Sequence, residues 1–121
     1  MDVYTIYADH TEEVTAHEFI RYMTKFLDKL VDGGRMEKYR ITRMKLGFRS
    51  MDMPDFRIDM EFNDMTQLDS AMSGVVTNEN NVNKEHVGFN KYVDVETIQH
   101  FLYRDFPDDL TKHREALENG K

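Results

Sequence analysis

The stretch Asp55–Asn63, DFRIDMEFN, decides the fold, because apolar and polar side chains alternate along it without a break. Four apolar side chains share one face: Phe56, Ile58, Met60 and Phe62. Four polar side chains share the other: Arg57, Asp59, Glu61 and Asn63. A period of two predicts a β-strand with two different faces. The apolar face needs a second layer to cover it, and the charged face is the first place to look for function.

A strand and a helix are predicted before this stretch. Residues 3–8 combine β-branched and aromatic side chains on both faces, which is typical of a central strand. Thr15 and Glu18 have the spacing of a capping box, so we expect a helix to begin there. An apolar stripe at helical spacing follows, and Gly33 and Gly34 end it.

The remaining elements are less regular. Residues 36–48 predict a second strand, in which the apolar side chains change face and therefore require a bulge near Thr42. Asp64 and Gln67 predict a second capping box and a shorter helix. Residues 95–106 predict a fourth strand, which Pro107 would end.

The order strand, helix, strand, strand, helix, strand predicts an α+β, ferredoxin-like fold. Its four-stranded antiparallel sheet has the order 4-1-3-2, with both helices on one face. We assign residues 1–106 to this domain and residues 107–121 to a C-terminal tail that is weakly helical or frayed. The second face of the sheet also needs cover, and in so short a chain a second copy usually provides it.

The chain resembles the dimeric alpha-beta barrel superfamily, in which two ferredoxin-like subunits pack sheet against sheet around a cavity. The resemblance covers residues 1–106 and rests on the element order, the long first helix, the segment FRIDMEFND and the final strand HFLYRDF. Within the superfamily the chain is most similar to small uncharacterised ferredoxin-like proteins from marine metagenomes. The resemblance implies a homodimer and leaves the function open, because members include quinone-forming monooxygenases, haem-degrading enzymes, isomerase-like proteins and stress-responsive proteins.

The composition excludes several classes of function. The net charge of −7 argues against binding to nucleic acids or anionic membranes. The absence of cysteine excludes disulfides and zinc–thiolate sites, and no compact metal motif or cofactor fingerprint is found. Without tryptophan, the chain lacks a residue that marks the haem-degrading and quinone-forming branches. The start of the chain has neither a basic region nor a long apolar run, so we expect a cytoplasmic protein with no signal peptide.

The charged face of the third strand has two interpretations. Arg57, Asp59 and Glu61 point toward the barrel side, where buried charges must pair or meet a ligand. They form either a charge ladder that seals the dimer interface or the wall of a ligand pocket. In the second case Arg57 suits a carboxylate, which it can hold with two parallel hydrogen bonds.

Other polar residues are candidates for contact with a ligand. His100 is the candidate acid or base, because imidazole titrates near neutral pH. Arg104 shares its face of the fourth strand, and His10 follows the first strand. His86 lies in the segment that superfamily members fold over the cavity. The phenols that could bond a ligand oxygen belong to Tyr7 and Tyr103.

We therefore predict a homodimer that binds a small, largely apolar or fatty-acid-like ligand with a polar head in the barrel cavity. One alternative is a cofactor-independent monooxygenase or isomerase that uses His100 as base. Another is a non-catalytic interaction protein whose barrel is filled by its own side chains.

Overall fold

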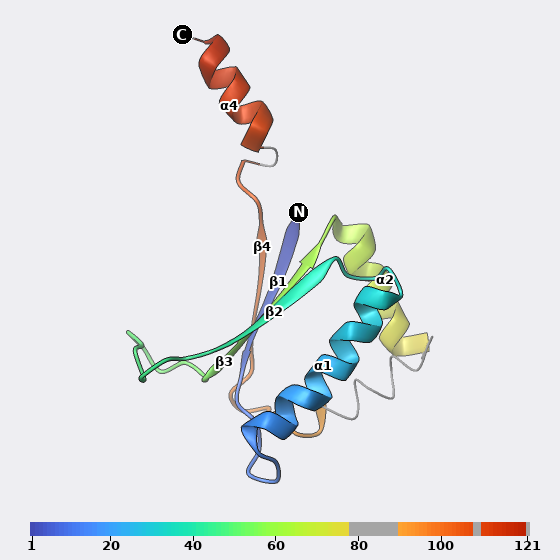
Figure 1. The fold of residues 1–121 in the computed structure, drawn as a ribbon, viewed down its shortest axis with the longest axis vertical. Helices are drawn as coiled ribbons and strands as arrows, with labels where there is room; N and C mark the ends of the chain where they lie inside the picture. The colour runs from blue at the N-terminus through green and yellow to red at the C-terminus, as the bar shows by residue number, and fades with distance from the viewer. Residues whose placement is uncertain (78–89, 108–109, 121) are drawn as a thin grey trace.

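Strand β3, Phe56–Phe62, lies inside an antiparallel four-stranded sheet in the computed structural model of the chain. The structure describes residues 1–77, 90–107 and 110–120. The other strands are β1, Asp2–Ala8, β2, Lys38–Arg43, and β4, Gln99–Arg104, in the order β2-β3-β1-β4. Helices α1 and α2 lie on one face of the sheet (Figure 1). The predicted α+β fold and the predicted strand order are both confirmed.

The register of the strands assigns every side chain to one of two faces. Tyr4 of β1 lies opposite Met60 of β3 and Leu102 of β4, all on the face toward the helices. We call the other side the open face. Its members are Lys38, Arg40 and Thr42 of β2, Arg57, Asp59 and Glu61 of β3, Val3, Thr5 and Tyr7 of β1, and Gln99, Phe101 and Tyr103 of β4.

Helix α1, Ala16–Asp32, begins and ends where its sequence predicts. Its capping box is complete, since Glu18 N–H donates to Thr15 Oγ1 and Thr15 N–H donates to Glu18 Oε1, both at 3.1 Å. The N–H of Gly33 donates to the carbonyl of Lys29 at the other end. Five buried side chains attach the helix to the sheet: Phe19, Met23, Phe26, Leu27 and Leu30.

Helix α2, Met65–Thr77, begins at a variant of the predicted capping box. Gln67 N–H donates to Asp64 Oδ1 at 2.9 Å. The side chain of Gln67 accepts from Asn63 N–H at 2.7 Å, one residue earlier than in a regular box. Ala71 of this helix is fully buried.

Two predicted strands are shorter than expected. Strand β2 ends at Arg43, so no bulge is needed, and the chain then makes a tight turn at residues 45–48. Phe48 N–H donates to the carbonyl of Lys45 across that turn, and Leu46 and Gly47 have φ angles of 57° and 68°. Strand β4 covers only Gln99–Arg104 of the predicted 95–106, because Thr97 N–H is bonded to Asp94 in a turn before the strand.

A further helix, α4, Leu110–Asn119, follows β4 and extends away from the sheet (Figure 1). The division into a domain of residues 1–106 and a tail of residues 107–121 stays a prediction. Within the described part of the chain, no helix combines the length and the apolarity needed to cross a lipid bilayer.

Candidate functional site

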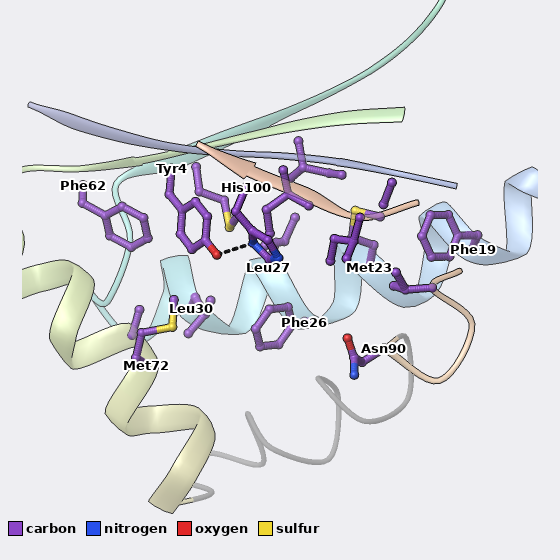
Figure 2. A pocket seen from close by; sticks show the side chains of 17 residues that line it. Tyr4, Phe19, Met23, Phe26, Leu27, Leu30, Phe62, Met72, Asn90 and His100 are labelled. Carbon is purple, nitrogen blue, oxygen red and sulfur yellow. Dashed lines mark hydrogen bonds between the residues drawn. The ribbon is translucent and has the colours of Figure 1, made fainter. Parts of the chain in front are cut away.

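A cavity of about 350 Å³ lies between the sheet and helices α1 and α2 (Figure 2). Its roof is the helix-facing side of β1, β3 and β4, and its floor is formed mainly by α1. Its volume falls at the lower end of the range of about 300–1,000 Å³ that is usual for small-molecule pockets. A site of this size suits a small organic ligand.

The lining of the cavity is almost entirely apolar. Carbon-rich side chains come from every surrounding element: Ile6, Ala8, Phe19, Met23, Phe26, Leu27, Leu30, Ile58, Met60, Phe62, Ala71, Met72, Val93 and Ile98. Among the described residues of the lining, three carry polar side chains, namely Tyr4, Asn90 and His100. A ligand with one polar group and an apolar body matches this distribution.

Tyr4 and His100 form the polar centre of the cavity (Figure 2). The phenol oxygen of Tyr4 lies 2.6 Å from Nδ1 of His100, which is hydrogen-bond distance. The two side chains meet because His100 is paired with Ile6 and Tyr4 with Leu102, so they are diagonal neighbours on one face. Burial raises the pKa of the Tyr4 phenol, because it disfavours the charged phenolate. His100 lies on the exposed edge strand, where a ligand can reach it.

The pair has two neutral proton arrangements. In one, the phenol O–H donates to Nδ1 of His100, and Nε2–H remains as a donor. In the other, Nδ1–H donates to the phenol oxygen, so that Tyr4 O–H is free to donate and Nε2 is free to accept a proton. Both arrangements offer a hydrogen-bond donor to a ligand oxygen, and the second also offers a base.

The charged side chains that β3 presents on the open face pair within the chain. Thr5 Oγ1 donates to Asp59 Oδ1 at 2.7 Å, and Arg57 Nε donates to the same carboxylate at 3.2 Å. Lys38 Nζ lies 3.6 Å from Glu61 Oε2. The three charged residues for which the sequence suggested a charge ladder, Arg57, Asp59 and Glu61, thus find ionic partners within their own chain.

The structure separates the predicted site residues. Five lie on the open face: Arg57, Asp59, Glu61, Tyr7 and Tyr103. On the helix side, His100 enters the cavity, and Arg104 is paired with Asp2 at the far end of β4. His10 lies beyond β1, where its Nδ1 is 2.7 Å from the carbonyl of Thr11 and its ring packs near Phe19. His86 lies outside the described residues.

Sequence reasoning missed Tyr4 and Asn90. Tyr4 shares its parity with Ile6 and Ala8, so a polar group on an otherwise apolar face was a usable signal. That signal does not identify the partner of Tyr4. The partner is His100, 96 positions away, and only the pairing of β1 with β4 brings the two together. Asn90 had no comparable signal, because it follows a segment without clear periodicity. Within the described residues, no group of three histidine, aspartate or glutamate side chains could hold a metal ion.

Comparison with known proteins supports the fold and adds no activity. A family model described as a family of unknown function (DUF6614) matches residues 1–118. No curated protein matches the chain significantly.

Several solved structures share the fold at low sequence identity. At3g17210 from Arabidopsis thaliana superimposes with a TM-score of 0.66 at 11% identity, covering 87% of this chain and 95% of its own. A protein from Thermobifida fusca gives 0.58 at 11% identity, covering 84% and 88%. A protein from Jannaschia sp. gives 0.60 at 11% identity, covering 87% and 100%. Both bacterial proteins are described as dimeric, ferredoxin-like and of unknown function, so the predicted ferredoxin-like resemblance is confirmed.

Proposed function

This chain belongs to the family of unknown function DUF6614, and we propose that it binds a small, largely apolar ligand with a polar head group. The proposed site is the cavity between the sheet and helices α1 and α2. The head group meets Tyr4 and His100, and the body lies against α1.

The hydrogen-bonded Tyr4–His100 pair in an otherwise apolar cavity carries this proposal. Each methylene group transferred from water into such a lining contributes about 0.8 kcal/mol. A polar head needs a partner in the same place, because an unbonded polar group costs roughly 1–3 kcal/mol when buried. The pair supplies that partner and fixes the orientation of the ligand.

This site differs in position from the barrel cavity that the sequence suggested. The cavity lies on the helix side of the sheet and is lined by residues of one chain. The barrel cavity enclosed between two sheets would need a second copy, and it stays a prediction.

The proposed assembly is a homodimer formed through the open face. Phe101 and Tyr103 are 39% and 53% exposed on that face, and their rings stack with centroids 6.3 Å apart. Exposed aromatic side chains in one patch favour association. The dimeric descriptions of the two bacterial neighbours support the same assembly.

A titration with octanoate and 1-octanol, followed by amide NMR, tests the binding site. We expect saturable shifts at Tyr4, Leu27 and His100 with at least one probe. Ala71 is fully buried against the cavity, so Ala71→Leu should fill part of it and weaken binding at least tenfold, equivalent to about 1.4 kcal/mol. Tyr4→Phe should weaken binding up to about tenfold through the loss of one hydrogen bond.

Met65→Leu is the matched control, because Met65 is 54% exposed on α2 and does not line the cavity. It should bind both probes as the parent does. Organic extraction followed by mass spectrometry shows whether the purified protein already carries a ligand. The proposal fails if neither probe gives saturable shifts in protein that carries no bound ligand, or if Ala71→Leu binds the probes as well as the parent does.

Isomerisation is a second candidate, favoured by the base that the Tyr4–His100 pair can present. Nε2 of His100 would take a proton from a carbon next to a carbonyl group, and Tyr4 O–H would donate to the resulting enolate oxygen. Return of that proton to another carbon completes the reaction without a cofactor. The monooxygenase and the filled-barrel alternatives stay predictions.

Deuterium incorporation into small cyclic ketones in D₂O, measured by mass spectrometry, tests this candidate. We expect exchange with the parent protein and loss of it in His100→Gln. Equal exchange in both proteins would remove His100 from the reaction.

A further inference from the structure

A second hollow lies on the open face, separate from the cavity. It is a groove of about 610 Å³ between the sheet and the connection from β2 to β3. The residues on which the inference depends are Tyr7, Thr42, Lys45, Leu46, Phe48 and Arg57. None of the described residues that line the groove also lines the cavity.

The groove carries positive charge in a chain whose net charge is −7. Arg43, Lys45 and Arg57 line it together with one carboxylate, Asp55. Asp55 is already bound by Arg49, whose Nη2 lies 2.6 Å from its Oδ1. Among the described residues, no carboxylate pairs with Lys45. The groove therefore has a surplus of cationic groups.

Arg57 is held in position by its neighbours. Its Nε lies 3.1 Å from Asp59 Oδ2, and its guanidinium carbon lies 5.8 Å from the centroid of the Tyr7 ring. Guanidinium has five N–H donors, and the bond to Asp59 uses only the one on Nε. The two terminal nitrogens can then hold a carboxylate or phosphate with parallel hydrogen bonds.

The turn that carries Lys45 is strained. Leu46 has a φ of 57°, a left-handed conformation that is uncommon for a bulky residue. Its side chain is 81% exposed, so packing does not offset the strain. Strained residues of this kind concentrate at ligand sites. Here the turn places Lys45 on the rim of the groove, beside the apolar side chains of Leu46 and Phe48.

We propose that the groove binds an anionic ligand in which a carboxylate or phosphate is attached to an aromatic or aliphatic group. Arg57 and Lys45 hold the anionic head, and Leu46 and Phe48 cover the apolar part. This inference goes beyond the proposed function, because it concerns the opposite side of the sheet and a different chemical class of ligand.

Amide NMR titrations with benzoate and phenyl phosphate test the proposal. We expect saturable shifts at Thr42, Lys45 and Arg57 with at least one anion, and the tighter binder identifies the preferred head group. Benzyl alcohol, which has the ring without the charge, should bind at least tenfold more weakly. Raising the salt concentration should weaken binding of the anions, because the ion pairs are exposed.

Substitutions separate this groove from other cationic surfaces. Arg57→Gln should weaken anion binding at least tenfold, and Lys45→Gln several-fold. Arg57→Lys keeps the charge but loses the two parallel bonds, so it should bind more weakly than the parent. Arg40→Gln is the matched control, because Arg40 is exposed on the same face but does not line the groove. Circular dichroism verifies that each variant is folded.

Three results would overturn the proposal. The first is an absence of saturable binding by both anions. The second is unchanged binding in folded Arg57→Gln and Lys45→Gln. The third is binding whose shifts centre on Tyr4 and His100, which would assign the anion to the cavity. None of these results depends on whether the cavity binds octanoate or 1-octanol.

Discussion

Neighbouring residues of β1 make different contacts, because consecutive side chains of a strand point to opposite faces of the sheet. Tyr4 points into the cavity and bonds His100, whereas Thr5 points to the open face and bonds Asp59. Thr5 is only 1% exposed, so its hydroxyl is a buried donor to a carboxylate. Strand β1 thus carries a hydrogen-bonded tyrosine–histidine pair on one side and part of a charge network on the other.

Thr5→Val should destabilise the protein by roughly 1.5–3 kcal/mol, the usual contribution of a hydrogen bond to a charged group. Valine keeps the shape of threonine and removes the donor to Asp59. Chemical denaturation measures the change in the free energy of unfolding. Thr42→Val is the control on the same face and should cost less than about 0.5 kcal/mol. Equal effects at both positions would show that the bond to Asp59 does not stabilise the fold.

At the scale of elements, α1 depends on its first turn. The Thr15 hydroxyl accepts from Glu18 N–H and satisfies an amide that the helix leaves open. Thr15→Ala should therefore lower the free energy of unfolding by about 1 kcal/mol, as measured by denaturation. Thr15→Ser keeps the acceptor and should recover most of that loss. If alanine and serine behave alike, the cap does not contribute.

The phenol of Tyr39 joins β2 to α1 through a bond of 2.6 Å to Asp28 Oδ1. Burial first, and then the bond and charge of Asp28, raise the pKa of Tyr39 to about 12. In the unfolded chain the same phenol titrates at about 10. Between these two pKa values the unfolded chain loses this proton and the folded chain keeps it. The contribution of Tyr39 to the free energy of unfolding is therefore complete below a pH of about 10 and is lost as the pH rises to about 12.

Absorbance at the tyrosinate band during an alkaline titration should show a late step at a pH of about 12, which Tyr39→Phe removes. Asp28→Asn should lower the pKa of Tyr39 only partly, because burial is the larger cause. A titration in which Tyr39→Phe leaves the late step unchanged would contradict this assignment.

Local patterns predicted the elements and their order, because capping boxes, glycine stops and alternation act over short stretches. The capping box at Thr15 and the alternation of β3 match the structure. The Tyr4–His100 pair could not be predicted in the same way, since it depends on the register of two strands distant in sequence. The turn at Leu46 was also missed, because leucine has no preference for the left-handed conformation.

At the scale of the whole molecule, one sheet separates two hollows of different character. The cavity is apolar and contains a single hydrogen-bonded polar pair, whereas the groove is open and cationic. A second copy packed on the open face would lie over the groove side and leave the helix-side cavity within each subunit. In such a dimer, the path by which a ligand enters the groove would depend on how the two copies pack.

The proposed homodimer can be tested through its exposed aromatic patch, Phe101 and Tyr103. Native mass spectrometry should show a dimer of the parent protein, and Phe101→Asp or Tyr103→Asp should weaken dimerisation at least about thirtyfold, equivalent to about 2 kcal/mol. The cause is the loss of apolar contact together with like charges placed across a two-fold interface.

Met65→Asp is the control, because Met65 is 54% exposed on the helix side, and it should remain dimeric. A monomeric parent would contradict the assembly. If Phe101→Asp becomes monomeric and still binds phenyl phosphate or benzoate, the groove is complete in one chain. If it loses that binding while staying folded, the second copy supplies part of the site, because Phe101 itself does not line the groove.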